Sequence, residues 1–126
     1  MTSEKTLFQK IINREIPAEI IYEDDRYIAI LDILPKTPGH TLLITKEPYA
    51  WVIDVPHFGD YFEKAKEIGL HLKEKLGASY ISFQTFGVEI PHAHIHIVPF
   101  YSHTEKWQRV EINKEELKEL GEKLKM

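Results

Sequence analysis

The sequence contains no cysteine. This absence excludes disulfide bonds, thiolate nucleophiles and thiolate zinc sites, so a nucleophile has to come from histidine, hydroxyl, lysine or carboxylate chemistry. The chain also lacks an apolar run of the roughly 18 residues that a membrane-spanning helix needs, and its polar start, MTSEKT, does not resemble a secretory signal. We therefore expect a cytoplasmic protein with no membrane partner.

Acidic residues outnumber basic ones, with 20 Asp and Glu against 16 Lys and Arg. The formal net charge is −4, with acids and bases interspersed along the chain. Because no basic stripe is present to follow a phosphate backbone, we expect no nucleic-acid polymer as a partner. A length of 126 residues with 43% hydrophobic content suits one domain that spans residues 1–126.

The spacing of apolar residues predicts an α+β fold. Helical spacing occurs in a short N-terminal segment at 7–14, ended by Pro17, in a long central segment from Phe58 to Leu76, and at about 113–125. Thr6 or Ser3 can cap the first helix, and Asn113 with Glu116 resembles a capping box for the last. Five β-rich runs are predicted at residues 19–22, 27–31, 41–45, 79–83 and 93–98. Short links between neighbouring strands favour antiparallel pairing, so we expect a meander sheet of about five strands with helices packed on it.

Histidine is the one candidate nucleophile that clusters. His92, His94 and His96 alternate with small or apolar residues in the segment His-Ala-His-Ile-His-Ile-Val-Pro. Successive side chains of a strand point to opposite faces, so the three imidazoles share one face and the apolar residues share the other. The apolar face can pack on helices while the imidazole face forms a site.

Three interpretations of this run remain open. The histidines can be the solvated face of a strand. They can bind a metal ion, although the Cα atoms of His92 and His96 lie about 13 Å apart in a regular strand, too far for one tetrahedral ion. Two of them could bind with help from His40, but no nearby cysteine or paired carboxylate motif completes a ligand set. The third interpretation is phosphoryl or nucleotidyl transfer, in which a neutral imidazole attacks phosphorus and its neighbours donate protons.

The residues from His92 to Pro99 resemble the signature of the histidine triad (HIT) superfamily. Residues 7–46 are similar to the Hint branch, the histidine triad nucleotide-binding proteins. The resemblance implies the HIT fold and an enzyme that acts without a cofactor. Such an enzyme is a hydrolase or transferase that attacks the α-phosphate of a purine nucleotide conjugate, of the adenosine phosphoramidate or aminoacyl-adenylate type, and releases AMP.

The resemblance also implies a role for each histidine. His94 is expected to be the nucleophile and to form a nucleotidyl-histidine intermediate that water hydrolyses. His96 would contact the α-phosphate and assist the leaving group, His92 would orient the site, and His40 would complete the set. The second ring nitrogen of His94 then needs an acceptor, such as a backbone carbonyl, so that the attacking nitrogen keeps its lone pair.

The same resemblance implies the nucleoside contacts. Asp32 matches the position that accepts hydrogen bonds from the ribose hydroxyls, although an aspartate before a proline-rich connection can also simply start a turn. Four apolar residues match the positions that sandwich the base, although ordinary core packing accounts for any one of them equally well; they are Phe8, Ile11, Ile30 and Ile33.

The segment before the triad departs from the family pattern. Gly87 is present and can offer its backbone amide to phosphate, but Val88 stands where glutamine is common. Glu89 stands where some Hint proteins place a serine that assists the leaving group. A carboxylate there can orient an amine leaving group but would repel a second phosphate. This favours phosphoramidates over dinucleoside polyphosphates as substrates.

Other expectations concern metals and assembly. Phe8 and Pro48 stand where many bacterial relatives carry a zinc-binding cysteine and histidine, which indicates a zinc-free variant. Related proteins are homodimers, and Trp51 or Trp107 could serve that contact or cap the core. The remaining histidines have no motif support and are interpreted as surface residues; they are His57, His71 and His103.

Alternative functions stay open at this level. The chain could be a nucleotide-binding interaction module with little catalysis, a dinucleoside polyphosphate hydrolase, or a metal-dependent hydrolase. The physiological leaving group and the base preference are not specified by the sequence, because apolar residues grip any purine in a similar way.

Overall fold

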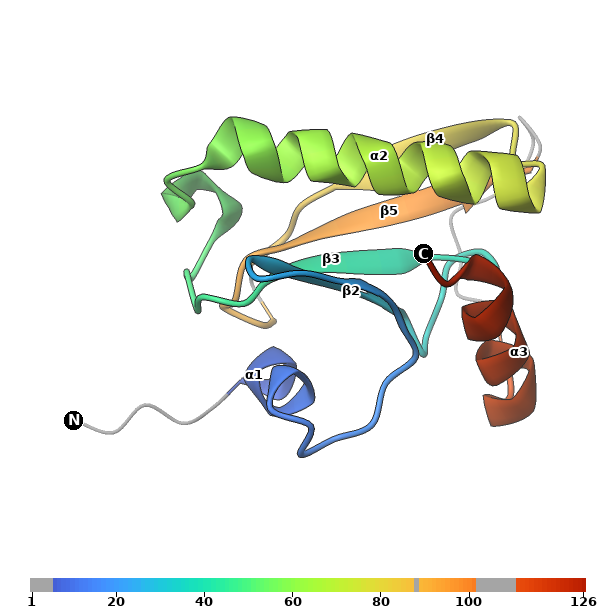
Figure 1. Ribbon diagram of the computed structural model, residues 1–126, viewed down its shortest axis with the longest axis horizontal. Coiled ribbons are helices and arrows are strands. Elements are labelled where there is room, and N and C mark those ends of the chain that lie inside the picture. The colour runs from blue at the N-terminus through green and yellow to red at the C-terminus, as the bar shows by residue number, and fades with distance from the viewer. Residues whose placement is uncertain (1–5, 88, 102–110) are drawn as a thin grey trace.

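The computed structural model describes residues 6–87, 89–101 and 111–126. These residues form an antiparallel sheet of five strands with helices on both of its faces (Figure 1). The helices are α1 (Leu7–Ile12), α2 (Phe58–Leu76) and α3 (Lys114–Leu124), with a short 3-10 helix, η1, at Val52–Asp54. The strands are β1 (Ile20–Glu23), β2 (Tyr27–Leu31), β3 (Thr41–Thr45), β4 (Tyr80–Gln84) and β5 (His94–Phe100). The predicted α+β class is confirmed.

The strand order departs from a plain meander. The order across the sheet is β1-β2-β3-β5-β4, so β3 pairs with β5 rather than with β4. The chain leaves β3, passes through α2, enters the sheet again at its far edge as β4, and turns back as β5. This crossover places the histidine strand in the middle of the sheet, directly beside β3.

The N-terminal helix is shorter than predicted. It ends at Ile12, with Asn13 as its C-cap, and not at Arg14 or Pro17. Arg14 adopts a left-handed conformation with φ of 63°, which turns the chain away from the helix axis before the proline is reached. The predicted cap at Thr6 is present, because its side chain accepts a hydrogen bond from the Gln9 amide in a capping box.

The strands β2, β3 and β5 are buried almost throughout, and α2 covers one face of the sheet (Figure 1). The Tyr61 hydroxyl at this interface donates to the carbonyl of Leu43 at 2.7 Å, which satisfies the only polar atom of that side chain. The buried residues on this face include Ala29, Leu31, Leu43, Ala93, Ile95, Ile97, Ala65, Ile68 and Leu72. The alternation predicted for the histidine strand therefore places its apolar residues against α2.

The opposite face of the sheet lies under α1. Phe8 and Ile11 of this helix pack against Ile28, Ile30, Leu42 and Ile44 of β2 and β3. Because α1 has only six residues, it covers part of this face and leaves room beside it. The space that remains is where the site described below is found.

The C-terminal helix α3 lies at the side of the sheet (Figure 1). Asn113 caps it by accepting a hydrogen bond from the Glu116 amide at 2.8 Å, as the capping-box pattern predicted. Leu124 is fully buried in the core under α2. Among the described residues, no helix combines the length and the apolar character that crossing a membrane requires.

Candidate functional site

A cavity of about 490 Å³ opens between α1, the strands β2, β3 and β5, and residues 86, 87, 89 and 90. Most of its wall is apolar, and the ionisable side chains along it are Asp32, Lys36, Glu89, His94 and His96. A concave apolar site with a few convergent polar groups is the common form of a small-molecule site.

His94 is held so that one ring nitrogen keeps its lone pair. Its Nδ1 lies 2.7 Å from the carbonyl oxygen of His92, and because a carbonyl can only accept, Nδ1 carries the proton. Burial lowers the pKa of His94 below the ordinary histidine value, although the His92 carbonyl and the Asp32 carboxylate favour the charged form. The ring is therefore a neutral imidazole, with Nε2 as its unprotonated nitrogen.

His92 is anchored in the same way but does not line the cavity. Its Nε2 donates to the carbonyl of Thr45 at 2.6 Å, and its Nδ1 accepts from the Thr6 hydroxyl at 3.1 Å. The residue is fully buried, and burial lowers its pKa. His92 thus fixes the start of the histidine strand and offers its carbonyl to His94.

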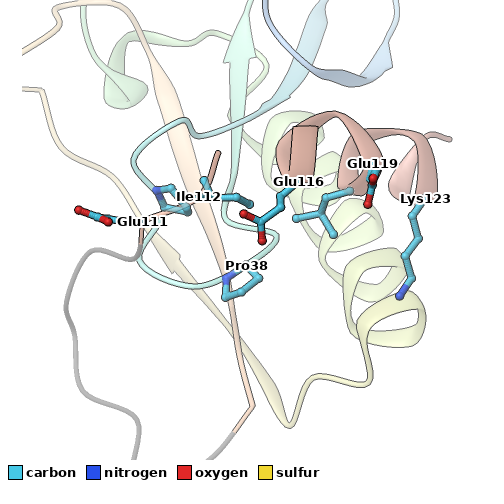
Figure 2. Close-up of a pocket in the computed structure, with 8 residues that line it drawn as sticks. Pro38, Glu111, Ile112, Glu116, Glu119 and Lys123 are labelled. Atoms are coloured by element: carbon cyan, nitrogen blue, oxygen red, sulfur yellow. The ribbon is translucent and has the colours of Figure 1, made fainter. Parts of the chain in front are cut away.

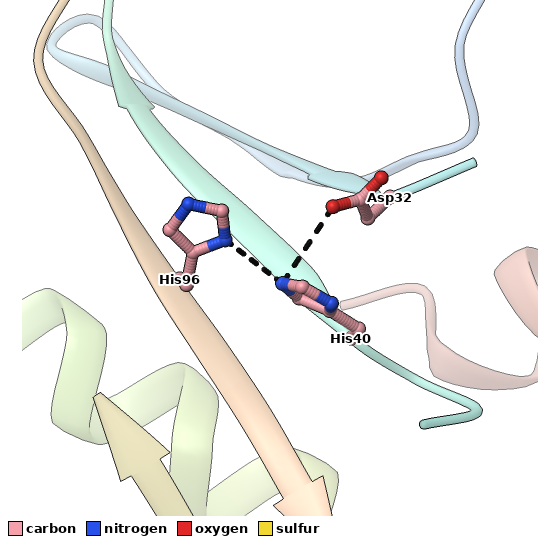
Figure 3. Close-up of side chains that lie close together, drawn as sticks. All are labelled: Asp32, His40 and His96. Carbon is pink, nitrogen blue, oxygen red and sulfur yellow. Dashed lines mark hydrogen bonds and ion pairs between the residues drawn. The ribbon is translucent and has the colours of Figure 1, made fainter. Parts of the chain in front are cut away.

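His40 and His96 form a hydrogen-bonded pair across the β3–β5 boundary (Figure 3). The amide of Lys36 lies 3.1 Å from His40 Nδ1, and because an N–H only donates, this nitrogen accepts. The proton of His40 is consequently on Nε2, which donates to His96 Nδ1 at 2.9 Å. His96 in turn carries its proton on Nε2 and can donate it within the cavity.

Asp32 lies beside this pair because of the loop that precedes β3. The Asp32 amide donates to the His40 carbonyl at 2.9 Å, and one carboxylate oxygen accepts from the Leu34 amide at 2.9 Å. The other oxygen is 3.6 Å from His40 Nε2, an ion-pair distance too long for a hydrogen bond. Gly39 permits the turn with φ of 95°, and an added Cβ would lie 2.4 Å from a methyl carbon of Leu76.

Asp32, His40 and His96 are also the described residues whose spacing could suit a metal ion, with ligand atoms within 4.8 Å of one another. Their hydrogen bonds do not fit one. An ion on His40 Nε2 would require the proton to move to Nδ1, where the Lys36 amide already donates. The sequence suggested a metal site of a different composition, with two of the histidines at 92, 94 and 96 together with His40.

The four predicted base-binding residues all line the cavity. Phe8 and Ile11 come from α1, Ile30 comes from β2, and Ile33 follows that strand with 66% of its surface exposed. The Phe8 ring also packs edge-on against His94, with 4.8 Å between the ring centroids. Phe8 therefore forms part of the wall and restrains the ring of His94.

Residues 86, 87, 89 and 90 form the remaining rim. Gly87 and Glu89 line the cavity, and Glu89 is exposed. Phe86 contacts the edge of His96 with a centroid separation of 5.3 Å. Val88, whose departure from the family pattern was noted above, lies outside the described residues.

Two of the histidines interpreted as surface residues are half-buried instead. His57 packs against the rings of Tyr27 and Tyr49, and His71 Nε2 donates to the Leu124 carbonyl at 2.8 Å. Aromatic packing and the α2–α3 contact explain them, and neither lines the cavity. His103 and Trp107 lie outside the described residues.

A second hollow, of about 400 Å³, lies between the proline-rich connection and α3 (Figure 2). It is lined by Pro35, Pro38, Glu111, Ile112, Glu116, Glu119, Leu120 and Lys123. None of the site residues predicted from the sequence is among them.

Several cavity residues were not predicted from the sequence. They are Leu7, Ile16, Pro17, Ala18, Leu31, Leu34, Lys36, Leu42, Phe86 and Ile90. For Leu42 a signal exists, because it pairs directly with Ile30 and alternation places both on one face. Leu7 and Leu31 lie on the predicted helix and strand, α1 and β2, without being singled out by their periodicity, and the others lie in loops whose paths no periodicity specifies.

Comparison with known proteins agrees with this geometry. The HIT domain family model matches residues 13–103. An uncharacterized HIT-like protein of Methanocaldococcus jannaschii is 35% identical over 102 residues, which cover 75% of this chain and 78% of that protein. The purine nucleoside phosphoramidase of Escherichia coli is 31% identical over 104 residues, which cover 76% of this chain and 87% of that protein.

A solved structure is similar over nearly the whole chain. A HIT-like protein of Bartonella henselae, described as involved in cell-cycle regulation and solved with an unknown ligand, superimposes with a TM-score of 0.88 at 29% identity. The match covers 98% of this chain and 96% of that one. With the family model, the relatives, the shared fold and the buried histidine cluster in agreement, the chain belongs to the HIT family, which includes hydrolases.

Proposed function

We propose that the protein hydrolyses purine nucleoside phosphoramidates or aminoacyl-adenylate-type conjugates at the α-phosphate and releases AMP. The observation that carries this proposal is the state of His94, a neutral imidazole whose Nδ1 is tied to a backbone carbonyl. A nitrogen lone pair held beside a proton-donating imidazole in an apolar cavity suits nucleophilic attack on phosphorus. The purine nucleoside phosphoramidase among the relatives supports the same chemistry.

In the proposed reaction, Nε2 of His94 attacks the α-phosphorus and the bond from phosphorus to the leaving amine breaks. The leaving nitrogen takes the proton from Nε2 of His96, whose Nδ1 is held by His40. Water then attacks the nucleotidyl-histidine, its proton returns to His96, and the bond from phosphorus to His94 breaks. The products are AMP and the free amine, and both histidines regain their starting states.

The AMP moiety would be recognised by the two sides of the cavity. The purine fits between the apolar residues of α1 and those of β2 and the following turn. Asp32 is available for the ribose hydroxyls, since its carboxylate is held at the cavity wall by the Leu34 amide. Apolar walls give little discrimination between purines, so we expect adenosine and guanosine conjugates both to be bound.

Glu89 favours a cationic leaving group. Its carboxylate is exposed on the rim of the same cavity as His94 and His96. An ammonium group on the departing amine would be attracted there, whereas a second phosphate would be repelled. In the variant Glu89→Gln, the ratio of kcat/KM for conjugates of lysine-like amines to that for conjugates of neutral alkyl amines should therefore decrease. The kcat/KM for dinucleoside polyphosphates should increase. An unchanged ratio would contradict this role of Glu89.

The direct test is to incubate the protein with adenosine phosphoramidate, to follow AMP by chromatography, and to search samples denatured in alkali for a nucleotide bound to the peptide that contains His94. The expected result is steady AMP release with a covalent nucleotide on that peptide. His57→Asn is the matched control, because it removes an imidazole outside the cavity at a helix N-cap position where asparagine is favoured. Tight AMP binding without turnover of any conjugate would instead favour a binding module, and loss of turnover with a chelator would favour a metal-dependent hydrolase.

We also propose that two copies associate in the cytoplasm. The strand β4 is at the edge of the sheet, and Tyr80, Phe83 and Leu70 on β4 and α2 are 40%, 42% and 58% exposed. In the described part of the chain no further strand pairs with the outer edge of β4, and such an edge beside apolar side chains favours edge-to-edge pairing. Light scattering after size exclusion should give the mass of a dimer, and Phe83→Glu should shift it to that of a monomer.

A further inference from the structure

We propose that Trp51 is a positioning residue, which holds the backbone at Phe86 and Gly87 over the cavity and thereby sets the ring of Phe86 against His96. This inference rests on the proposed function for its catalytic consequence, and on contacts in the structure for the brace itself. Trp51 follows β3 at the N-cap of η1, and the segment it contacts lies 36 residues further along the chain.

The contact between Trp51 and Gly87 is specific to these two residue types. The indole Nε1 donates to the Gly87 carbonyl at 3.2 Å. A Cβ added to Gly87 would lie 2.2 Å from Cδ1 and 2.6 Å from Nε1 of Trp51, so the indole lies directly against the glycine backbone. The backbone of Gly87 does not have a positive φ, and the indole ring is therefore what requires a glycine at this position.

The residue next to Gly87 contacts one of the histidines of the cavity. Phe86 and Gly87 both line the cavity, and the Phe86 ring meets the ring of His96 in a T-shaped contact, with an interplanar angle of 72°. Phe86 is 55% exposed, so little core packing fixes its place. Its position depends on the backbone that Trp51 holds.

The backbone that carries Trp51 is itself anchored to the histidine strand. The Ala93 amide donates to the Tyr49 carbonyl at 2.7 Å, and the Thr45 amide donates to the Ala93 carbonyl at 3.3 Å. Val52, the next residue, is buried in the core. Trp51 itself is nevertheless 52% exposed, so this large aromatic residue contributes little to core packing. Its placement is explained by the contact with Gly87.

The test combines three variants with two measurements. Trp51→Ala should increase amide hydrogen exchange in the peptide that covers residues 85–91 and lower kcat for adenosine phosphoramidate about tenfold, with a smaller change in KM, since misplaced groups mainly affect the transition state. Trp51→Phe keeps an aromatic ring and should restore part of kcat. Ile53→Ala is the matched control, because Ile53 lies two residues away on the same turn and is 83% exposed.

A double-mutant cycle isolates the contact. Gly87→Ala should lower kcat in the wild-type background, because its methyl group meets the indole, and should cost much less in the Trp51→Ala background. Additive effects of the two substitutions, or exchange at residues 85–91 that is the same in Trp51→Ala and Ile53→Ala, would overturn the brace. Absence of turnover by the wild-type protein would overturn the proposed function instead, and the exchange measurement would still decide whether the brace exists.

Discussion

The two halves of the histidine cluster are held by different kinds of partner. His92 and His94 donate to backbone carbonyls, those of Thr45 and of His92 itself, and burial lowers the pKa of both. His40 and His96 are bonded to each other, with the carboxylate of Asp32 at 3.6 Å from His40. In the first pair each ring donates its proton to a main-chain carbonyl, whereas in the second pair the ring of His40 donates to the ring of His96. The remaining Nδ1 atoms of His92 and His40 accept from the Thr6 hydroxyl and the Lys36 amide.

This difference separates two tasks that one residue type performs. A backbone carbonyl cannot give or take a proton, so it fixes one neutral form of His94 and keeps Nε2 ready to attack. A hydrogen bond between two imidazoles can change which nitrogen holds the proton, so it suits a proton donor that must be recharged. In the proposed reaction, attack falls to the carbonyl-bound half and proton transfer to the side-chain half.

The largest effect should come from removing the attacker. His94→Gly is expected to lower kcat/KM for adenosine phosphoramidate by about 10⁴-fold, because no other nitrogen of the cluster replaces it. AMP affinity, measured by calorimetry, should change far less, since the apolar wall and Asp32 remain. If turnover by His94→Gly equalled that of the wild type, attack would have to be assigned to another group.

Breaking the proton-transfer half should have a smaller effect that depends on the substrate. His40→Asn removes the Nε2 donor that fixes the tautomer of His96, and about a 10²-fold loss is expected for conjugates with basic amine leaving groups. For conjugates whose leaving group departs without a proton, kcat of the His40→Asn variant should decrease little. A plot of kcat against leaving-group basicity checks this, and an equal loss for every leaving group would contradict the division of tasks.

The pH dependence tests the attacking half without mutation. The pKa of His94 is lowered from the ordinary value of 6.5, so the neutral form persists at pH 7 and kcat/KM should fall only at a pH below 6.5, by about tenfold per unit. Stability should follow the same sign. Both buried histidines disfavour protonation in the folded state, so the free energy of unfolding should decrease as pH falls below 6.5 and through their lowered pKa values.

Those experiments would measure kcat/KM and urea unfolding across the acidic range. An acidic limb of the kcat/KM profile with its midpoint above pH 6.5 would show that burial does not control the pKa of His94.

Part of this arrangement was predictable from the sequence. The bounds of β2, β3 and α2 match the predicted ones, because their periodicity is regular and the long helix stops at Gly77 in a left-handed C-cap. The placement of Ala93, Ile95 and Ile97 against α2 follows from strand alternation alone. Local pattern was sufficient for these elements, whereas it did not specify the end of α1 at Ile12.

The rest depends on how distant segments meet. The hydrogen bond from His40 to His96 requires β3 and β5 to be neighbours, which the crossover through α2 brings about and no local pattern specifies. The contact of Trp51 with Gly87 likewise joins two irregular segments. Loop conformations and strand order are set by tertiary packing, so these features appear only in the folded chain.

The smallest effect on kcat is expected from removing a helix cap. Two caps can be compared, of which only one contacts the histidine cluster. Thr6 caps α1 and donates to His92 Nδ1, while Asn113 caps α3 away from the cavity. Thr6→Ala and Asn113→Ala should each lower the free energy of unfolding in urea by about 1 kcal/mol. Only Thr6→Ala should also lower kcat, by roughly threefold, because His92 keeps its bond to Thr45 and loses just one of two anchors. Equal kcat values in the two variants would mean that the carbonyl of Thr45 alone positions His92, and that the hydroxyl serves the helix and not the site.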